Sequence, residues 1–191
     1  MQIGGRSVTK ILTSVLQKQH YIAASNMVRI YERPLDALGR YLLQIGNYPE
    51  TIVVLTPIGR IPLRIYSHHD MLTVNEIFCR LDYMAQADDR VVVDFGSNIG
   101  ISAAYFLTRS PHSHVYLYEP LDVNVERLHK NLQPFDGRYT LHKAAIALGE
   151  GEAEFGWEES GRYGGIGIKT GNYIRVKCLD SNEVLKTTLA A

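Results

Sequence analysis

The sequence predicts an α/β protein whose C-terminal half is built around a parallel β-sheet. Three apolar runs, at residues 91–95, 114–118 and 139–146, have the length and the β-branched or aromatic content of buried strands. Segments with helical spacing of apolar residues separate these runs. An acidic residue stands at the end of the first run and directly after the second. Strands that alternate with helices favour parallel pairing with right-handed crossovers.

Residues 1–85 are expected to form an N-terminal extension of helices and a β-hairpin. Residues 7–30 read as one helix, and Pro34 suits the first turn of a second helix that Gly46 would cap. That second helix would carry an apolar face of Leu35, Leu38, Leu42 and Ile45. Two strands within residues 51–66 would be joined by a turn at Pro57–Arg60.

A third helix of this extension is expected to begin near Thr73. Thr73 and Glu76 have the spacing of a capping box, in which each side chain bonds the other's backbone N–H. Ile77, Phe78 and Leu81 would form its apolar face.

Residues 86–191 are expected to form the main domain. Its strands and helices alternate from Val91, and two further strands flank the glycine-rich segment 161–171. The predicted order is strand 91–95, helix 101–107, strand 114–118, a helix opened by Pro120, strand 139–146, and strands within 151–159 and 172–180.

The residues at the ends of the first two strands form a candidate ligand site. Ligands of open parallel sheets bind at the carboxyl ends of the strands, where Asp94 and Glu119 would both lie. Gly96 and Gly100 would let the backbone approach a ligand closely. The N-terminus of the following helix would point its amide groups at the same place. Glu119 could accept both hydroxyl hydrogens of a ribose, so the site suits a nucleoside-containing cofactor.

The charge of the site favours S-adenosylmethionine over a dinucleotide. A dinucleotide site needs G-x-G-x-x-G, and D-F-G-S-N-I-G at residues 94–100 lacks that spacing. Asp94 would repel a pyrophosphate but attract the positively charged amino group of S-adenosylmethionine. The segment 161–171 is not a phosphate-binding loop of the G-x-x-x-x-G-K-[ST] type, because Ile168 precedes its lysine.

Several segments together resemble the FkbM family of S-adenosylmethionine-dependent methyltransferases, which are class I enzymes with a Rossmann-like sheet. The resemblance covers residues 70–181 and rests on VVVDFGSNIGISAAYF, VYLYEP, ERLHKNL, LHKAAIALGEGEAEF and VKCLDS. The pair D-x-G-S-N-x-G and Y-E-P is typical of class I methyltransferases. The segments A-A-I-A and C-L-D-S narrow the resemblance to this family.

The resemblance implies a set of cofactor-binding residues. It places Asp94, Gly96, Ser97, Asn98 and Gly100 along the methionine and ribose part of the cofactor. By the same comparison Glu119 would bind the ribose hydroxyls and Pro120 would shape the turn beneath them. Adenine would be flanked by Ala144, Ala145 and Ile146. Family members typically methylate a hydroxyl oxygen of a small molecule or sugar. No catalytic base is identifiable from the sequence.

The C-terminal end departs from the family pattern. Proteins of this family continue past L-D-S with a strand near a K-I-D-x-E-G pattern, whereas this chain reads SNEVLKTTLAA and stops. The sheet is therefore expected to be incomplete on that side, as in a truncated chain. Strand 91–95 would have an unpaired apolar edge, through which the chain could form a homo-oligomer.

Each feature also has a plainer interpretation. Asp94 could be a helix cap, and Asn98 a turn residue. His68, His69 and Asp70 lack a further ligand at metal-site spacing, so no metal site is predicted. Two other functions stay open. One is a nucleotide-cofactor enzyme such as a dehydrogenase. The other is a non-catalytic or degenerate protein that keeps the fold and binds a cofactor or partner without turnover.

Composition limits the partners and the location. Lysine and arginine together number 20, as do aspartate and glutamate, so neither nucleic acid nor an anionic membrane surface is indicated. No apolar stretch approaches the roughly 20 residues of a membrane span, and no signal peptide is recognisable. The two isolated cysteines, Cys79 and Cys178, suit a reducing cytoplasm.

Overall fold

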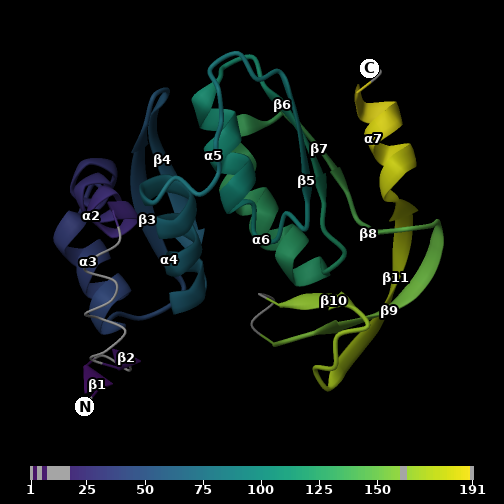
Figure 1. The fold of residues 1–191 in the computed structure, drawn as a ribbon, viewed down its shortest axis with the longest axis horizontal. Coiled ribbons are helices and arrows are strands. Elements are labelled where there is room, and N and C mark those ends of the chain that lie inside the picture. Colours follow the sequence, from purple (N-terminus) through teal and green to yellow (C-terminus); the bar gives the residue numbers. More distant parts are fainter. Residues whose placement is uncertain (1, 4–5, 8–17, 160–162, 190–191) are drawn as a thin grey trace. The chain divides into compact units, whose positions relative to one another are not determined.

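The computed structural model describes residues 2–3, 6–7, 18–159 and 163–189. The chain divides into two compact units, Met1–Met84 and Ala85–Ala191. Figure 1 shows their elements, coloured along the sequence.

The N-terminal unit packs helices against a two-stranded hairpin. Strands β3 and β4 pair antiparallel, as predicted, and their inward residues Val54, Leu63 and Ile65 are fully buried together with Met71 and Phe78. The described elements are β1 (Gln2–Ile3), β2 (Arg6–Ser7), α2 (Lys18–Ile30), α3 (Pro34–Leu43), β3 (Glu50–Thr56), β4 (Gly59–Ile65), α4 (His68–Val74) and the π-helix η1 (Asn75–Cys79).

Two predicted helix boundaries of this unit need correction. The expected helix 7–30 is observed as α2 from Lys18, whereas Ser7 belongs to strand β2 and residues 8–17 lie outside the described part. Helix α3 starts at Pro34 as predicted, but its C-terminal cap is Gln44, with a left-handed φ of 56°, rather than Gly46.

Most of the predicted apolar face of α3 is wrong, because only Leu38 of its four residues is partly buried. Leu35, Leu42 and Ile45 are exposed, and the helix instead buries Ala37 and Arg40. Arg40 is tolerated there because its guanidinium bonds Asp36 at 2.9 Å and Glu50 at 3.1 Å. A buried cation needs such partners, which helical periodicity alone does not reveal.

The capping box at the third helix lies six residues earlier than predicted. Ser67 Oγ accepts from Asp70 N at 3.3 Å, while the Asp70 carboxylate accepts from Ser67 N at 3.0 Å. Thr73 instead lies inside α4, where its hydroxyl donates to the His69 carbonyl. In the described part of the chain no cluster of His, Cys, Asp and Glu could hold a metal ion.

The C-terminal unit contains the parallel sheet and a second, mostly antiparallel one. Strands β5, β6 and β7 pair in that order. All three are parallel, as the alternating pattern predicts. The second sheet has the order β10-β9-β11-β8. The elements are β5 (Val91–Phe95), α5 (Ile101–Arg109), β6 (His114–Tyr118), α6 (Asp122–Leu132), the 3₁₀ turn η2 (Gln133–Phe135), β7 (Tyr139–His142), β8 (Ala145–Ala147), β9 (Gly151–Trp157), β10 (Gly164–Ile166), β11 (Asn172–Asp180) and α7 (Ser181–Leu189).

The predicted strand 139–146 is in fact two strands that belong to different sheets. The Ala144 N–H folds back to the His142 carbonyl at 2.9 Å, which ends β7. Residues 145–147 then pair in parallel with β11. The chain thus crosses from one sheet to the other, a change that a continuous apolar run conceals.

Two buried clusters hold this unit together. One lies between the parallel sheet and the helices α5 and α6, and consists of Leu107, Val115, Leu117, Leu128 and Leu132, all fully buried. The other joins the start of α6 to the second sheet through Leu121, Ala145, Phe155, Val176 and Cys178. In Figure 1, α5 and α6 lie on one side of the parallel sheet and α7 on the other.

No helix in the described ranges is both long and apolar enough to cross a membrane.

Gly100 offers a test of how α5 packs on α6. Its φ is 83°, and a Cβ there would lie 3.1 Å from Leu128 and 3.2 Å from Leu132. We expect Gly100→Ala to lower the free energy of unfolding by about 1–3 kcal/mol, from backbone strain and overpacking together. Urea unfolding followed by circular dichroism measures this. Gly149→Ala is the matched control, because its Cβ would meet nothing within 4 Å. Equal stability of the two variants would contradict the described packing.

Candidate functional site

A cleft of about 430 Å³ lies at the carboxyl ends of the parallel strands. The loops after β5 and β6 form one side, while β8 and the β9–β10 hairpin form the other. Its lining residues are Phe95, Gly96, Asn98, Tyr118, Glu119, Pro120, Leu121, Asn124, Ala145, Ile146, Phe155, Gly164, Gly165 and Ile166. The cleft therefore lies where an open parallel sheet is expected to bind a ligand.

The loop after β5 is fixed by the end of β6. The N–H groups of Gly96 and Ser97 both donate to the Tyr118 carbonyl, at 2.9 and 3.1 Å. Ser97 Oγ donates to the Asp94 carbonyl and accepts from Tyr118 N. The loop needs left-handed backbone at Gly96 and Asn98, with φ of 79° and 47°. Glycine and asparagine adopt this conformation most readily, which explains their place in the motif.

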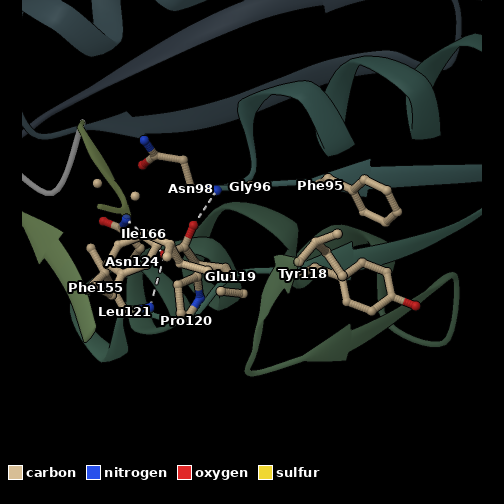
Figure 2. A pocket seen from close by; sticks show the side chains of 14 residues that line it. Phe95, Gly96, Asn98, Tyr118, Glu119, Pro120, Leu121, Asn124, Phe155 and Ile166 are labelled. Atoms are coloured by element: carbon tan, nitrogen blue, oxygen red, sulfur yellow. Dashed lines mark hydrogen bonds between the residues drawn. The ribbon is translucent and has the colours of Figure 1, made fainter. Parts of the chain in front are cut away.

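The Glu119 carboxylate is the polar centre of the cleft, although only 4 % of the residue is exposed. Oε2 accepts from the N–H of Asn98 at 2.9 Å. Oε1 accepts from Leu121 N at 3.0 Å and from Asn124 Nδ2 at 3.2 Å. Figure 2 shows the carboxylate between these groups. A carboxylate accepts about four hydrogen bonds, so Oε2 can still take one donor from a ligand.

The pKa values of the two carboxyl groups at the strand ends, Asp94 and Glu119, are both raised. Burial raises the pKa of Glu119, an effect that its hydrogen bonds from Leu121, Asn124 and Asn98 partly offset. Burial also raises the pKa of Asp94, against the hydrogen bonds from Ser102 and Ser97. Negative charge on Asp94 adds a smaller increase to the pKa of Glu119. Both groups therefore hold their protons more tightly than exposed carboxyls do.

The structure brings six of the ten predicted site residues to the cleft: Gly96, Asn98, Glu119, Pro120, Ala145 and Ile146. The other four lie beside it and shape it. The Asp94 carboxylate accepts from Ser102 Oγ at 2.7 Å, in the first turn of α5. Ser97 is buried, and its hydroxyl bonds the backbone of Asp94 and Tyr118. Gly100 packs on α6. Ala144 is buried at the crossing between the two sheets.

The far wall of the cleft comes from residues that are not among the ten predicted site residues. Phe155 on β9 and residues 164–166 on β10 line it. The sequence predicts a strand around Phe155, and the segment 161–171 suits a loop near the substrate mouth and a plain hairpin connection equally well. The structure places residues 164–166 of that segment in the wall of the cleft. In Figure 2, Phe155 and Ile166 lie with Leu121 and Asn124, whereas the Phe95 and Tyr118 rings point elsewhere. These two rings contact each other edge to face, with centroids 5.4 Å apart.

The charge on the described wall of the cleft is negative only. Among the described lining residues Glu119 is the only charged one, since no lysine or arginine contributes to the wall. A cleft with one carboxylate and no cation favours neutral or positively charged ligands and disfavours a pyrophosphate.

These features define an α/β protein with a ligand cleft at the carboxyl ends of a parallel sheet. No protein-family model matches the chain. A segment of 81 residues, 42 % of the chain, is 36 % identical to part of the AMB antimetabolite synthetase AmbE of Pseudomonas aeruginosa. That segment corresponds to only 4 % of the length of the synthetase.

Among solved structures, the chain is similar to the candidate RNA methyltransferase PH1948 from Pyrococcus horikoshii. The two are 20 % identical with a TM-score of 0.29, over 42 % of this chain and 38 % of the other.

The pKa of Glu119 gives a prediction for stability against pH. A carboxyl with a raised pKa in the folded state adds stability below its unfolded value, near 4.5, and that contribution is lost as the pH rises through the folded value. The difference in unfolding free energy between wild type and Glu119→Gln should therefore decrease as the pH rises from about 4.5. Denaturant titrations at several pH values measure it. A difference that grows with pH would mean that the hydrogen bonds outweigh burial.

Proposed function

We propose that this chain binds S-adenosylmethionine in the cleft and transfers its methyl group to a hydroxyl oxygen of a small molecule or sugar. One observation carries the proposal most strongly. Three successive segments, after β5, after β6 and at β8, meet around a buried carboxylate. Each of them contains residues that the resemblance to FkbM-type methyltransferases assigns to the cofactor.

The cleft suits this cofactor in size, polarity and charge. Its volume of about 430 Å³ lies in the range of small-molecule sites. The free acceptor position on Glu119 Oε2 suits a ribose hydroxyl, so one hydroxyl would bond it directly rather than two. A Cβ at Gly96 would meet nothing within 4 Å, so that side of the loop is open to a ligand. The absence of a cation among the described lining residues suits a sulfonium better than a phosphate.

In this proposal the residues of the chain bind and orient the reactants. Glu119 and the backbone of the loop 96–98 would hold the nucleoside part, and Ala145 and Ile146 would flank adenine. S-adenosylmethionine, when bound, supplies an electrophilic methyl group. The contribution of the chain is then mainly alignment of the acceptor oxygen with that methyl group.

One observation favours a second function, namely cofactor binding without turnover. Deprotonation of the acceptor hydroxyl would gain from a general base. Among the described lining residues Glu119 is the only carboxylate or imidazole, and three donors already bond it. His142 is not part of this wall and stacks on Tyr118 with centroids 4.9 Å apart. A protein that senses or stores the cofactor would need no base.

Calorimetric titration with S-adenosylhomocysteine tests the shared part of both functions. Wild type should bind, and Glu119→Ala should lower the affinity by about tenfold or more, because the ligand loses its acceptor and the amides of Asn98 and Leu121 lose theirs. Glu150→Gln, an exposed carboxylate outside the cleft, is the control and should bind like wild type. A folded wild type that shows no binding would contradict the proposal.

The β10 strand gives a second, milder test of the same cleft. Ile166 lines it and is 44 % exposed, whereas Ile168 is 45 % exposed and does not line it. We expect Ile166→Ala to weaken S-adenosylhomocysteine binding by about fivefold, in line with about 1 kcal/mol of lost apolar contact. Ile168→Ala should leave it unchanged. Equal effects of both variants would place the ligand elsewhere.

Methyl transfer itself separates the two functions. Purified chain is incubated with S-adenosylmethionine carrying a labelled methyl group and a panel of hydroxylated acceptors. Label in an acceptor that depends on Glu119 supports the enzyme. Tight binding without transfer to any acceptor supports the non-catalytic alternative.

A further inference from the structure

Asn124 carries a buried amide that reaches the polar centre of the cleft. It lies in the first turn of α6, is 2 % exposed and belongs to the lining of the cleft. Its Nδ2 donates to Oε1 of Glu119 at 3.2 Å. Its backbone N–H donates to the Leu121 carbonyl at 3.1 Å, which fixes the start of the helix beside the carboxylate. Figure 2 shows the Asn124 side chain next to Glu119.

The donors around the Glu119 carboxylate are divided unequally between its two oxygens. Leu121 N and Asn124 Nδ2 both bond Oε1, whereas Asn98 N bonds Oε2. Each carboxylate oxygen has about two acceptor positions, so Oε1 is filled and Oε2 keeps one at the cleft. Without the Asn124 amide, Oε1 would also have a free position, and only main-chain donors would hold the carboxylate in its orientation.

We propose that Asn124 is a positioning residue of the cleft, whose amide fixes the Glu119 carboxylate as the acceptor of a ribose hydroxyl. This inference rests on the proposed binding of S-adenosylmethionine and deepens it. Asn124 is not among the ten predicted site residues. It acts on the ligand through Glu119, because its amide makes Oε2 the oxygen that is open to the cleft.

The amide also favours the charged form of Glu119, which is the form that accepts from a hydroxyl. Burial raises the pKa of Glu119, and the hydrogen bonds from Leu121, Asn124 and Asn98 lower it. Negative charge on Asp94 adds a smaller increase. Removal of the Asn124 amide should therefore raise the pKa of Glu119 further, so that the acceptor form is lost at a higher pH than in wild type.

The charged and titratable groups on the elements around Glu119 stay the same in every variant proposed here. Asp94 lies near the end of β5, and His142 ends β7 and stacks on Tyr118. Asp122 begins α6 and forms an exposed ion pair with Lys143. A difference between variants therefore reports on the Asn124 amide.

Calorimetric titration with S-adenosylhomocysteine from about pH 4.5 to about pH 8 tests the proposal. The affinity of wild type should fall as the pH decreases through the pKa of Glu119. Asn124→Ala should weaken binding by about fivefold or more at the upper end of the range and move the fall to higher pH. Nuclear magnetic resonance of the labelled Glu119 carboxyl carbon follows the same titration in the chain without ligand.

Asn131→Ala is the matched control. Asn131 lies on the same helix, is 1 % exposed and donates from Nδ2 to the Ile99 carbonyl at 2.9 Å, but it does not line the cleft. Its loss should lower the stability of the chain without a shift in the Glu119 titration. Asn124→Leu keeps a branched side chain without the donor, and it should repeat the shift if Asn124→Ala does not fold.

The outcomes separate this inference from the proposed function. If wild type binds S-adenosylhomocysteine and the Asn124 variants titrate and bind like wild type, the positioning role is overturned and the proposed function stands. An equal shift in Asn131→Ala would also overturn it, because general loosening of α6 would then explain the effect. A folded wild type that does not bind would overturn the proposed function, and the inference with it.

Discussion

The site depends on the hydrogen bonds between the end of β6 and the loop after β5. The Tyr118 carbonyl accepts two consecutive amides of that loop, and the Glu119 carboxylate accepts a third from Asn98. Tyr118 and Glu119 are buried, and the loss of either acceptor would leave more than one donor without its partner. These hydrogen bonds hold the loop and its left-handed residues Gly96 and Asn98 in place.

The same hydrogen bonds determine what each of the two acidic residues contacts. The Asp94 carboxylate accepts a hydrogen bond from Ser102 in the first turn of α5, so it is directed at the helix and not at the cleft. The Glu119 carboxylate accepts a hydrogen bond from Asn98 in the loop, and its Oε2 still has one acceptor position at the cleft. Both carboxyls are costly to bury, as their raised pKa values show.

The second sheet completes the cleft because one small apolar cluster ties it to the first. Leu121 follows Glu119 directly and packs with Phe155 and Val176 of the second sheet. The same contact brings β10 to the cleft wall opposite the loop. The cluster therefore links the second sheet to the segment that holds Glu119, because Leu121 also donates its N–H to the Glu119 carboxylate.

Much of this organisation was predictable because it is local. The order of strands and helices from Val91 follows from periodicity, and the glycine and asparagine positions of the loop follow from backbone conformations that few residues adopt. Predictions failed where a distant contact decides the outcome. The buried Arg40 depends on Glu50, and the break after His142 depends on pairing with β11.

The sequence by itself determined the α/β class, the parallel order of β5 to β7, and the identity of the residues at their carboxyl ends. Only the tertiary structure decided which of those residues face the cleft, and that Phe155 and Ile166 form its far wall. The physical reason is the range of the interactions. Strand and turn preferences act within a few residues, whereas the cleft is formed by hydrogen bonds and apolar contacts between segments far apart in the chain.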